Sequence, residues 1–197
     1  MNGFLRRVPA ADWKKAQRDE DFLLELTSVD EGAALLANGD ILKALPWYFR
    51  WPAKLLYRKQ LASLGGQGGA AAGTVLDLHK SWQALHWLLC ESPWEGPEPL
   101  RSAILGGEEK GEDLGYGPAR LVDPGKVGEV AKALALLSAA QILQRYDGRK
   151  MEAAEVYPGG FADDEDWQEE LQEEFERLKV FYAEAAKRGE GVVSWLS

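Results

Sequence analysis

The sequence predicts a helix-rich α+β fold. Long segments carry apolar residues at spacings of three and four, and short β-compatible segments lie near both ends and in the middle of the chain. Hydrophobic residues make up 46% of the 197 residues and aromatic residues 10%, as is typical of a globular protein. A chain of this length can bury a core without disulfides or bound metals.

The N-terminal region is predicted to form a strand followed by one helix. Residues 3–8 are mostly β-compatible, and Pro9 ends them. The helix then extends to about Thr27. Its apolar face consists of Trp13, Ala16, Phe22, Leu23 and Leu26. A second, shorter helix is predicted at 30–36.

Residues 41–73 are predicted to form helix and then loop. The pattern of 41–64 is helical, but Pro46 and Pro52 must lie at helix starts or kinks, and the longest helix is expected to begin at Pro52. Nine residues, 65–73, are rich in glycine and predict a flexible loop or linker.

A helix is predicted at 79–90, a short helix at 100–105 and a strand at 119–122. The first of these helices has one face with spacings of three and four. That face contains Trp82, Leu85, His86 and Leu89.

A further helix is predicted from Gly125 to about Tyr146. Asp123 is a typical N-cap and Pro124 a typical first residue. Residues 130–143 are apolar nearly all round, so we expect this helix to be buried on more than one side.

The C-terminal region is predicted to contain a strand at 155–157, a helix at about 163–187 and a closing strand at 191–196. The helix has the clearest amphipathic pattern in the chain. Its apolar positions are Trp167, Leu171, Phe175, Leu178, Tyr182 and Ala185.

Charge is distributed unevenly. The net charge is −9, and residues 163–176 contain nine acidic residues and no basic one. We interpret this segment either as a solvated helix face or as a surface that attracts a basic partner. Residues 43–59 are instead basic and aromatic. They fit contact with nucleic acid or a membrane, or docking onto the acidic helix or at an interface; the overall negative charge favours docking.

The candidate reactive side chains are few. His79 and His86 are the only histidines, and seven residues of helix separate them by about 10.5 Å, too far to share a metal ion. We expect His86 to be a hydrogen-bonded core residue rather than a general base. Cys90 is the single cysteine, so no internal disulfide can form, and we expect it to have a packing role.

The glycine-rich motifs give weak signals for ligand binding. The segment at 66–71 fits a dinucleotide-binding pattern but follows no strand, and residues 69–74 lack the lysine of a phosphate loop. Gly106-Gly107 and the glycines around Tyr116 are better explained as turns. Arg120 could hold an anion, but a structural ion pair is the simpler interpretation.

Five motifs together resemble a known family. They are KSWQALHWLL, PLRSAILGG, GYGPARLVDPGKV, VYPGGF and FYAEAAKRG. The sequence resembles the YfbM-like family of small, uncharacterised bacterial proteins, well over 76–197 and loosely at the N-terminus. The resemblance implies a compact α+β domain with helices packed around a small sheet, which we expect to be mixed. It brings no activity, cofactor or catalytic residue. Residues 41–73 look like an insertion in a single domain spanning 1–197.

Two functions are consistent with these observations. The first is a non-catalytic, cytoplasmic protein-binding domain, in one form an immunity protein that neutralises a toxin. Its acidic surface would include Glu169, Glu170, Glu173 and Glu174 and would bind a basic protein. The second is a small enzyme or ligand-binding domain. Its pocket would lie near Trp82, His86, Tyr116 and Arg120.

The cellular setting follows from what the sequence lacks. It has no signal-peptide pattern and no apolar run of membrane-spanning length, so we expect a cytoplasmic protein. We expect no cofactor, no metal ion, and neither nucleic acid nor membrane as a partner. A deep pocket that exposes His86 would favour the enzyme; a flat acidic face and a buried His86 would favour the binding domain.

Overall fold

The computed structural model describes residues 1–28, 75–162 and 166–197. The predicted helices at 30–36 and 41–64, the loop at 65–73 and the proposed insertion lie outside the described residues. So do the first acidic residues of the C-terminal segment, 163–165.

The described strands form a five-stranded sheet with the order β2-β1-β5-β4-β3. Their bounds are β1 (Gly3–Val8), β2 (Val75–Asp77), β3 (Glu108–Lys110), β4 (Ala119–Val122) and β5 (Gly191–Leu196). The strands predicted at 3–8, 119–122 and 191–196 are confirmed. We expected a mixed sheet, but all four pairings are antiparallel.

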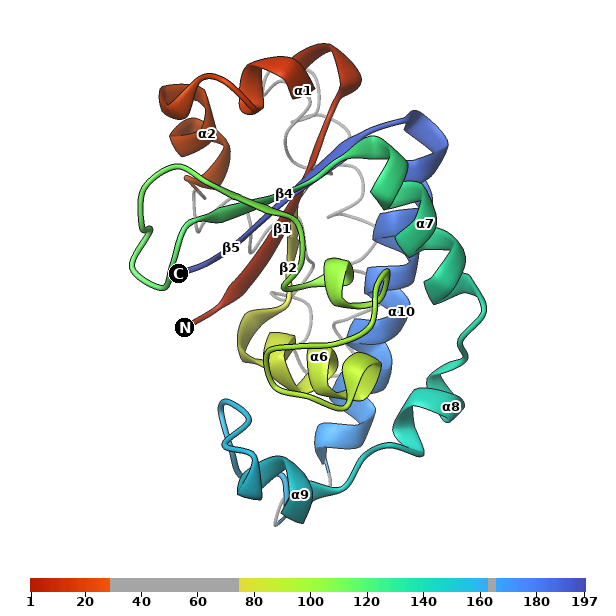
Figure 1. Cartoon of the computed structure of the whole chain (residues 1–197). Coiled ribbons are helices and arrows are strands. Elements are labelled where there is room, and N and C mark those ends of the chain that lie inside the picture. Colours follow the sequence, from red (N-terminus) through yellow and green to blue (C-terminus); the bar gives the residue numbers. More distant parts are fainter. Residues whose placement is uncertain (29–74, 163–165) are drawn as a thin grey trace, which may run out of the picture.

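The two ends of the chain form the centre of this sheet. β1 and β5 pair over six residues, from Gly3 opposite Leu196 to Val8 opposite Gly191. Asn2 and Ser197 extend the pairing, since each donates its backbone N–H to the other's carbonyl. The two termini therefore lie close together (Figure 1).

Helices cover both faces of the sheet, and the fold is α+β (Figure 1). The described helices are α1 (Ala10–Ala16), α2 (Glu20–Thr27), α6 (Trp82–Cys90), α7 (Pro124–Ala135), α8 (Ala139–Leu143), α9 (Gly148–Ala153) and α10 (Asp166–Arg188). Successive side chains of β5 point to opposite faces of the sheet, so the protein has two hydrophobic cores. Val192 and Leu196 pack with α6, α7 and α10 in the larger core, whereas Val193 and Trp195 pack with α1 and α2 in the smaller one.

The long C-terminal helix α10 anchors the larger core. Five of the six predicted apolar positions are buried, and the sixth, Trp167, is half-buried with its ring 4.9 Å from Phe161. Tyr182 is fully buried, and its hydroxyl donates to the carbonyls of Ser102 and Ala103, both at 3.1 Å. These bonds join α10 to the 3₁₀ turn Arg101–Ala103, which occupies the place of the helix predicted at 100–105.

Two long helices of the prediction are each broken in two. The predicted N-terminal helix divides at Asp19, whose carboxylate accepts the Phe22 N–H and begins α2. The helix predicted over 125–146 begins as expected with Asp123 as N-cap, but a capping box between Ser138 and Gln141 begins α8. In both places a side chain caps the N-terminus of the next helix, and the preceding helix ends a few residues earlier.

The expectation that the 125–146 region is buried on several sides is wrong. Val127, Val130 and Leu134 of α7 are buried, yet Leu136, just beyond its end, is 81% exposed. The helix thus buries a single face against α10 and the sheet, despite its apolar composition.

The strand predicted at 155–157 is also wrong. These residues follow α9, and the Tyr157 N–H donates to the side-chain carbonyl of Gln83 at 2.8 Å instead of joining the sheet. Prediction missed α9 and the three-residue strands β2 and β3. None of the helices within 1–28, 75–162 and 166–197 is long and apolar enough to cross a membrane.

Candidate functional site

His86 lies on α6 with none of its surface exposed. Its Nε2 donates to the Glu95 carbonyl at 3.1 Å, because a carbonyl oxygen can only accept. Burial lowers the pKa of His86 from 6.5 to about 4, so the ring is neutral near pH 7. The expectation of a hydrogen-bonded core histidine is confirmed, and solvent has no access to this ring.

Trp82 is also fully buried, one turn before His86 on the same helix. Its ring lies 5.9 Å from Trp94 and 6.4 Å from Tyr157. A Cβ added at Gly3 would lie 2.6 Å from the Trp82 Cβ, so α6 and β1 are in direct contact here. Trp82 therefore has a packing role between the helix and the sheet.

Cys90 ends α6 and is half-buried. Burial, followed by the nearby Glu98 carboxylate, raises the pKa of its thiol to about 11. The thiolate needed for nucleophilic chemistry is therefore scarce at neutral pH. The close approach of Gly96 supports a packing role for Cys90: a Cβ added at Gly96 would lie 2.5 Å from the Cys90 sulfur.

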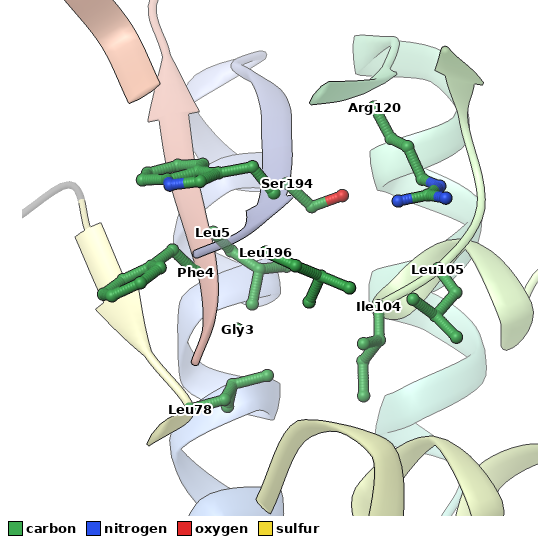
Figure 2. A pocket seen from close by; sticks show the side chains of 10 residues that line it. Gly3, Phe4, Leu5, Leu78, Ile104, Leu105, Arg120, Ser194 and Leu196 are labelled. Atoms are coloured by element: carbon green, nitrogen blue, oxygen red, sulfur yellow. The ribbon is translucent and has the colours of Figure 1, made fainter. Parts of the chain in front are cut away.

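Arg120 lies at a small hollow on the face of the sheet that α6, α7 and α10 cover. Figure 2 shows its guanidinium and the Ser194 hydroxyl, which points toward it from the neighbouring strand. The Ser194 oxygen is buried and has no hydrogen-bond partner within the described part of the chain. Arg120 pairs with Glu109 at 3.1 Å, and this agrees with the predicted structural ion pair.

The size of this hollow limits what it can hold. It is lined by Gly3, Phe4, Leu5, Leu78, Ile104, Leu105, Arg120, Ser194, Trp195 and Leu196. Its volume is about 10 Å³, roughly the space required by one water molecule. Ligand pockets are typically about 300 Å³ or larger, so an organic substrate does not fit.

Unlike the buried Trp82 and His86, Tyr116 is 54% exposed, and it lies on the loop between β3 and β4. Asp113 fixes this loop by accepting the N–H groups of Gly115 and Gly117 at 2.7 and 2.8 Å. Both glycines have positive φ, as the predicted turns require. Of the four residues predicted to surround a pocket, only Arg120 lines the hollow in Figure 2.

The acidic surface of α10 differs from the prediction at one position. Glu169, Glu170 and Glu173 are exposed, whereas Glu174 is only 2% exposed. Glu174 forms an ion pair with Arg177, which also donates to the Asp77 carbonyl of β2 at 3.2 Å. Glu174 therefore faces the protein, and we define the α10 acidic surface as Glu169, Glu170 and Glu173.

Spacing could have identified Glu174 as an inward residue. It lies three positions after Leu171 and four before Leu178, both fully buried, so it belongs to the same side of the helix. Glu174 had been predicted to share a surface with Glu169, Glu170 and Glu173 only because all four are acidic. Glu169 and Glu170 form no ion pair with any residue that the structure describes.

A larger groove, with a volume of about 140 Å³, lies between α2 and the β3–β4 loop, and no motif in the sequence predicted it. As for metals, no group of three or more His, Cys, Asp or Glu side chains in the described ranges is placed to hold an ion.

Comparison with known proteins identifies a family and a similar solved structure. The family described as "Domain of unknown function (DUF1877)" matches residues 1–195. The crystal structure of YfbM from Escherichia coli, a protein of unknown function, superposes with a TM-score of 0.62 and 15% identity over 98% of each chain. At this identity the likeness shows the fold alone. No curated protein matches the chain.

Proposed function

Because the chain belongs to the DUF1877 family, whose function is unknown, we propose its function from its own surface: it is a non-catalytic domain that binds a basic protein. We place this activity in the cytoplasm. One concrete form is an immunity protein that neutralises a toxin by covering a basic part of its surface.

The observation that carries this proposal is the α10 acidic surface. Glu169, Glu170 and Glu173 project from the first half of a 23-residue helix whose other side is buried against the core. The first two have no ion-pair partner among the described residues, so their charge is available to a partner. Clustered charge of one sign speeds association with an oppositely charged protein and rejects like-charged ones.

The state of the reactive side chains also supports binding over catalysis. The His86 ring is fully buried with its pKa lowered to about 4, and burial raises the pKa of the Cys90 thiol to about 11. The hollow at Arg120 has room for roughly one water molecule. The alternative, an enzyme with a pocket near Trp82, His86, Tyr116 and Arg120, therefore gains no support from these residues.

The test is an affinity capture from native cytosol at low and moderate salt, followed by mass spectrometry. We expect one basic protein at low salt that is lost as salt rises, since exposed charges are screened. It should also be lost with Glu169→Gln/Glu170→Gln/Glu173→Gln. A control with the same charge change, Asp12→Asn/Glu108→Gln/Glu155→Gln, alters three exposed acids elsewhere and should retain it.

Two results would contradict the proposal. One is that no specific protein is retained at either salt concentration. The other is that the α10 variant retains the same protein as well as the control variant does.

A further inference from the structure

We propose that the groove between α2 and the β3–β4 loop is a docking site for an arginine or lysine side chain on a partner protein. This inference goes beyond the function proposed above. The groove lies on the sheet face covered by α1 and α2, whereas α10 covers the opposite face (Figure 1). It is thus a second surface with its own test.

The groove combines an apolar floor with acidic walls. It is lined by Glu20, Asp21, Leu23, Leu24, Thr27, Lys110, Gly111, Glu112, Leu114 and Ala119. Leu23 and Ala119 are buried in the smaller core, while Leu24 is 46% exposed. The floor of the groove is therefore continuous with the smaller core, and Leu24 offers apolar surface to a bound side chain.

The described lining of the groove carries a net negative charge. Glu20 and Asp21 come from the first turn of α2, and Glu112 comes from the loop opposite. None of the three forms an ion pair with another described residue. Among the described lining residues Lys110 supplies the one basic group, which leaves an excess of two negative charges. Such a groove favours a cation.

Hydrogen bonds within the protein fix both walls of the groove in the absence of a partner. Asp19 caps α2 through the Phe22 N–H, and Asp113 holds the loop through Gly115 and Gly117. Gly111 brings the loop against α2: a Cβ there would lie 3.3 Å from the Leu23 side chain. A preformed groove binds with less loss of conformational entropy than a loop that must first be ordered.

An arginine or lysine side chain matches this combination. Its aliphatic stem can pack on Leu23 and Leu24 while its charged end meets the acidic walls. The volume of about 140 Å³ is below the roughly 300 Å³ of typical small-molecule pockets but is several times that of a water molecule. The occupant is therefore a single side chain of a larger partner. Tyr116, on the same loop, is exposed and can contact the part of the partner around that side chain.

The test is an NMR titration of the full chain with the dipeptide acetyl-Leu-Arg-amide. Acetyl-Leu-citrulline-amide is the matched control, because citrulline has the shape of arginine without its charge. We expect saturable shifts of the backbone amides of residues 20–27 and 110–119 with the arginine peptide. The citrulline peptide should bind roughly tenfold more weakly, and added salt should lower the affinity of the arginine peptide for the groove.

Variants separate this groove from the α10 acidic surface. Glu20→Gln/Asp21→Asn/Glu112→Gln should abolish the shifts, and Leu24→Ser should weaken them. Glu169→Gln/Glu170→Gln/Glu173→Gln should leave them unchanged, so the result does not depend on the function proposed for α10. All variants should give dispersed spectra, since these side chains are exposed or at the groove surface.

The inference would be overturned by the absence of saturable shifts in these two segments, by equal binding of both peptides, or by binding that survives the groove variant. Putrescine that binds as tightly as the arginine peptide would also overturn it, because the groove would then select a free diamine rather than a protein.

Discussion

The Arg177 guanidinium bridges the buried Glu174 carboxylate on its own helix and the Asp77 carbonyl on β2. One arginine thus joins α10 to β2, which lies at the edge of the sheet formed by the described strands. Arg177→Leu should lower the free energy of unfolding by about 3 kcal/mol, because it leaves a carboxylate buried without this partner. Urea unfolding at pH 7 measures the change.

The matched control for Arg177 is Lys187→Leu, on the same helix but exposed. Its effect should stay within about 0.5 kcal/mol. Equal effects of the two substitutions would show that the Glu174 contact contributes little to stability.

Tyr182 provides a second test of how α10 is held. Tyr182→Phe removes only the hydroxyl that donates to two buried carbonyls. We expect a loss of about 1–2 kcal/mol, because both carbonyls lose a donor where water cannot replace it. Tyr116→Phe, at an exposed position, should change thermal unfolding little. A Tyr182→Phe protein as stable as the wild type would contradict the assignment.

The pKa of His86 predicts a loss of stability in mild acid. Because burial lowers this pKa from 6.5 to about 4 in the folded state, the unfolded chain takes up a proton first as pH falls. The stabilising contribution is present above pH 6.5 and is lost toward pH 4, with a magnitude of about 3 kcal/mol.

His86→Gln should remove this part of the pH dependence, as urea unfolding at pH 7 and pH 4.5 would show. Carboxylates titrate in the same range in both proteins, so the difference between them isolates the histidine. An NMR titration of the folded protein with a His86 midpoint near pH 6.5 would refute the expectation.

Two glycines on different elements should respond to alanine in opposite directions. Gly3→Ala places a methyl group 2.6 Å from the Trp82 Cβ and should cost about 1–3 kcal/mol. Gly128→Ala, inside α7, meets no atom within 4 Å and should stabilise by about 0.5–1 kcal/mol through helix propensity. Thermal unfolding of the two variants gives the comparison, and a neutral Gly3→Ala would contradict the close packing of β1 on α6.

Patterns that depend on one element were predictable from the sequence. The spacing of Leu171, Phe175 and Leu178 identified α10, and the Asp123-Pro124 pair identified the start of α7. The breaks at Asp19 and Ser138 were missed although both are typical N-caps, because the apolar periodicity continues across them.

Features that depend on distant partners were not predictable. β2 and β3 have three residues each and exist because a longer strand lies beside them. The same limit applied to the candidate sites. Burial of His86 followed from its helix face, but the groove depends on the contact of α2 with a loop some ninety residues later, for which no local pattern gives a signal.

The pairing of β1 with β5 has a consequence for the order of folding. β5, at the centre of the sheet, comes after the other described strands in the sequence, and its neighbours β1 and β4 cannot be joined into one sheet until β5 has been synthesised. The helices can form earlier from local contacts, whereas the sheet must close across nearly the whole chain, which is slow. Loss of only the six residues of β5 would therefore remove the middle of this sheet rather than its edge.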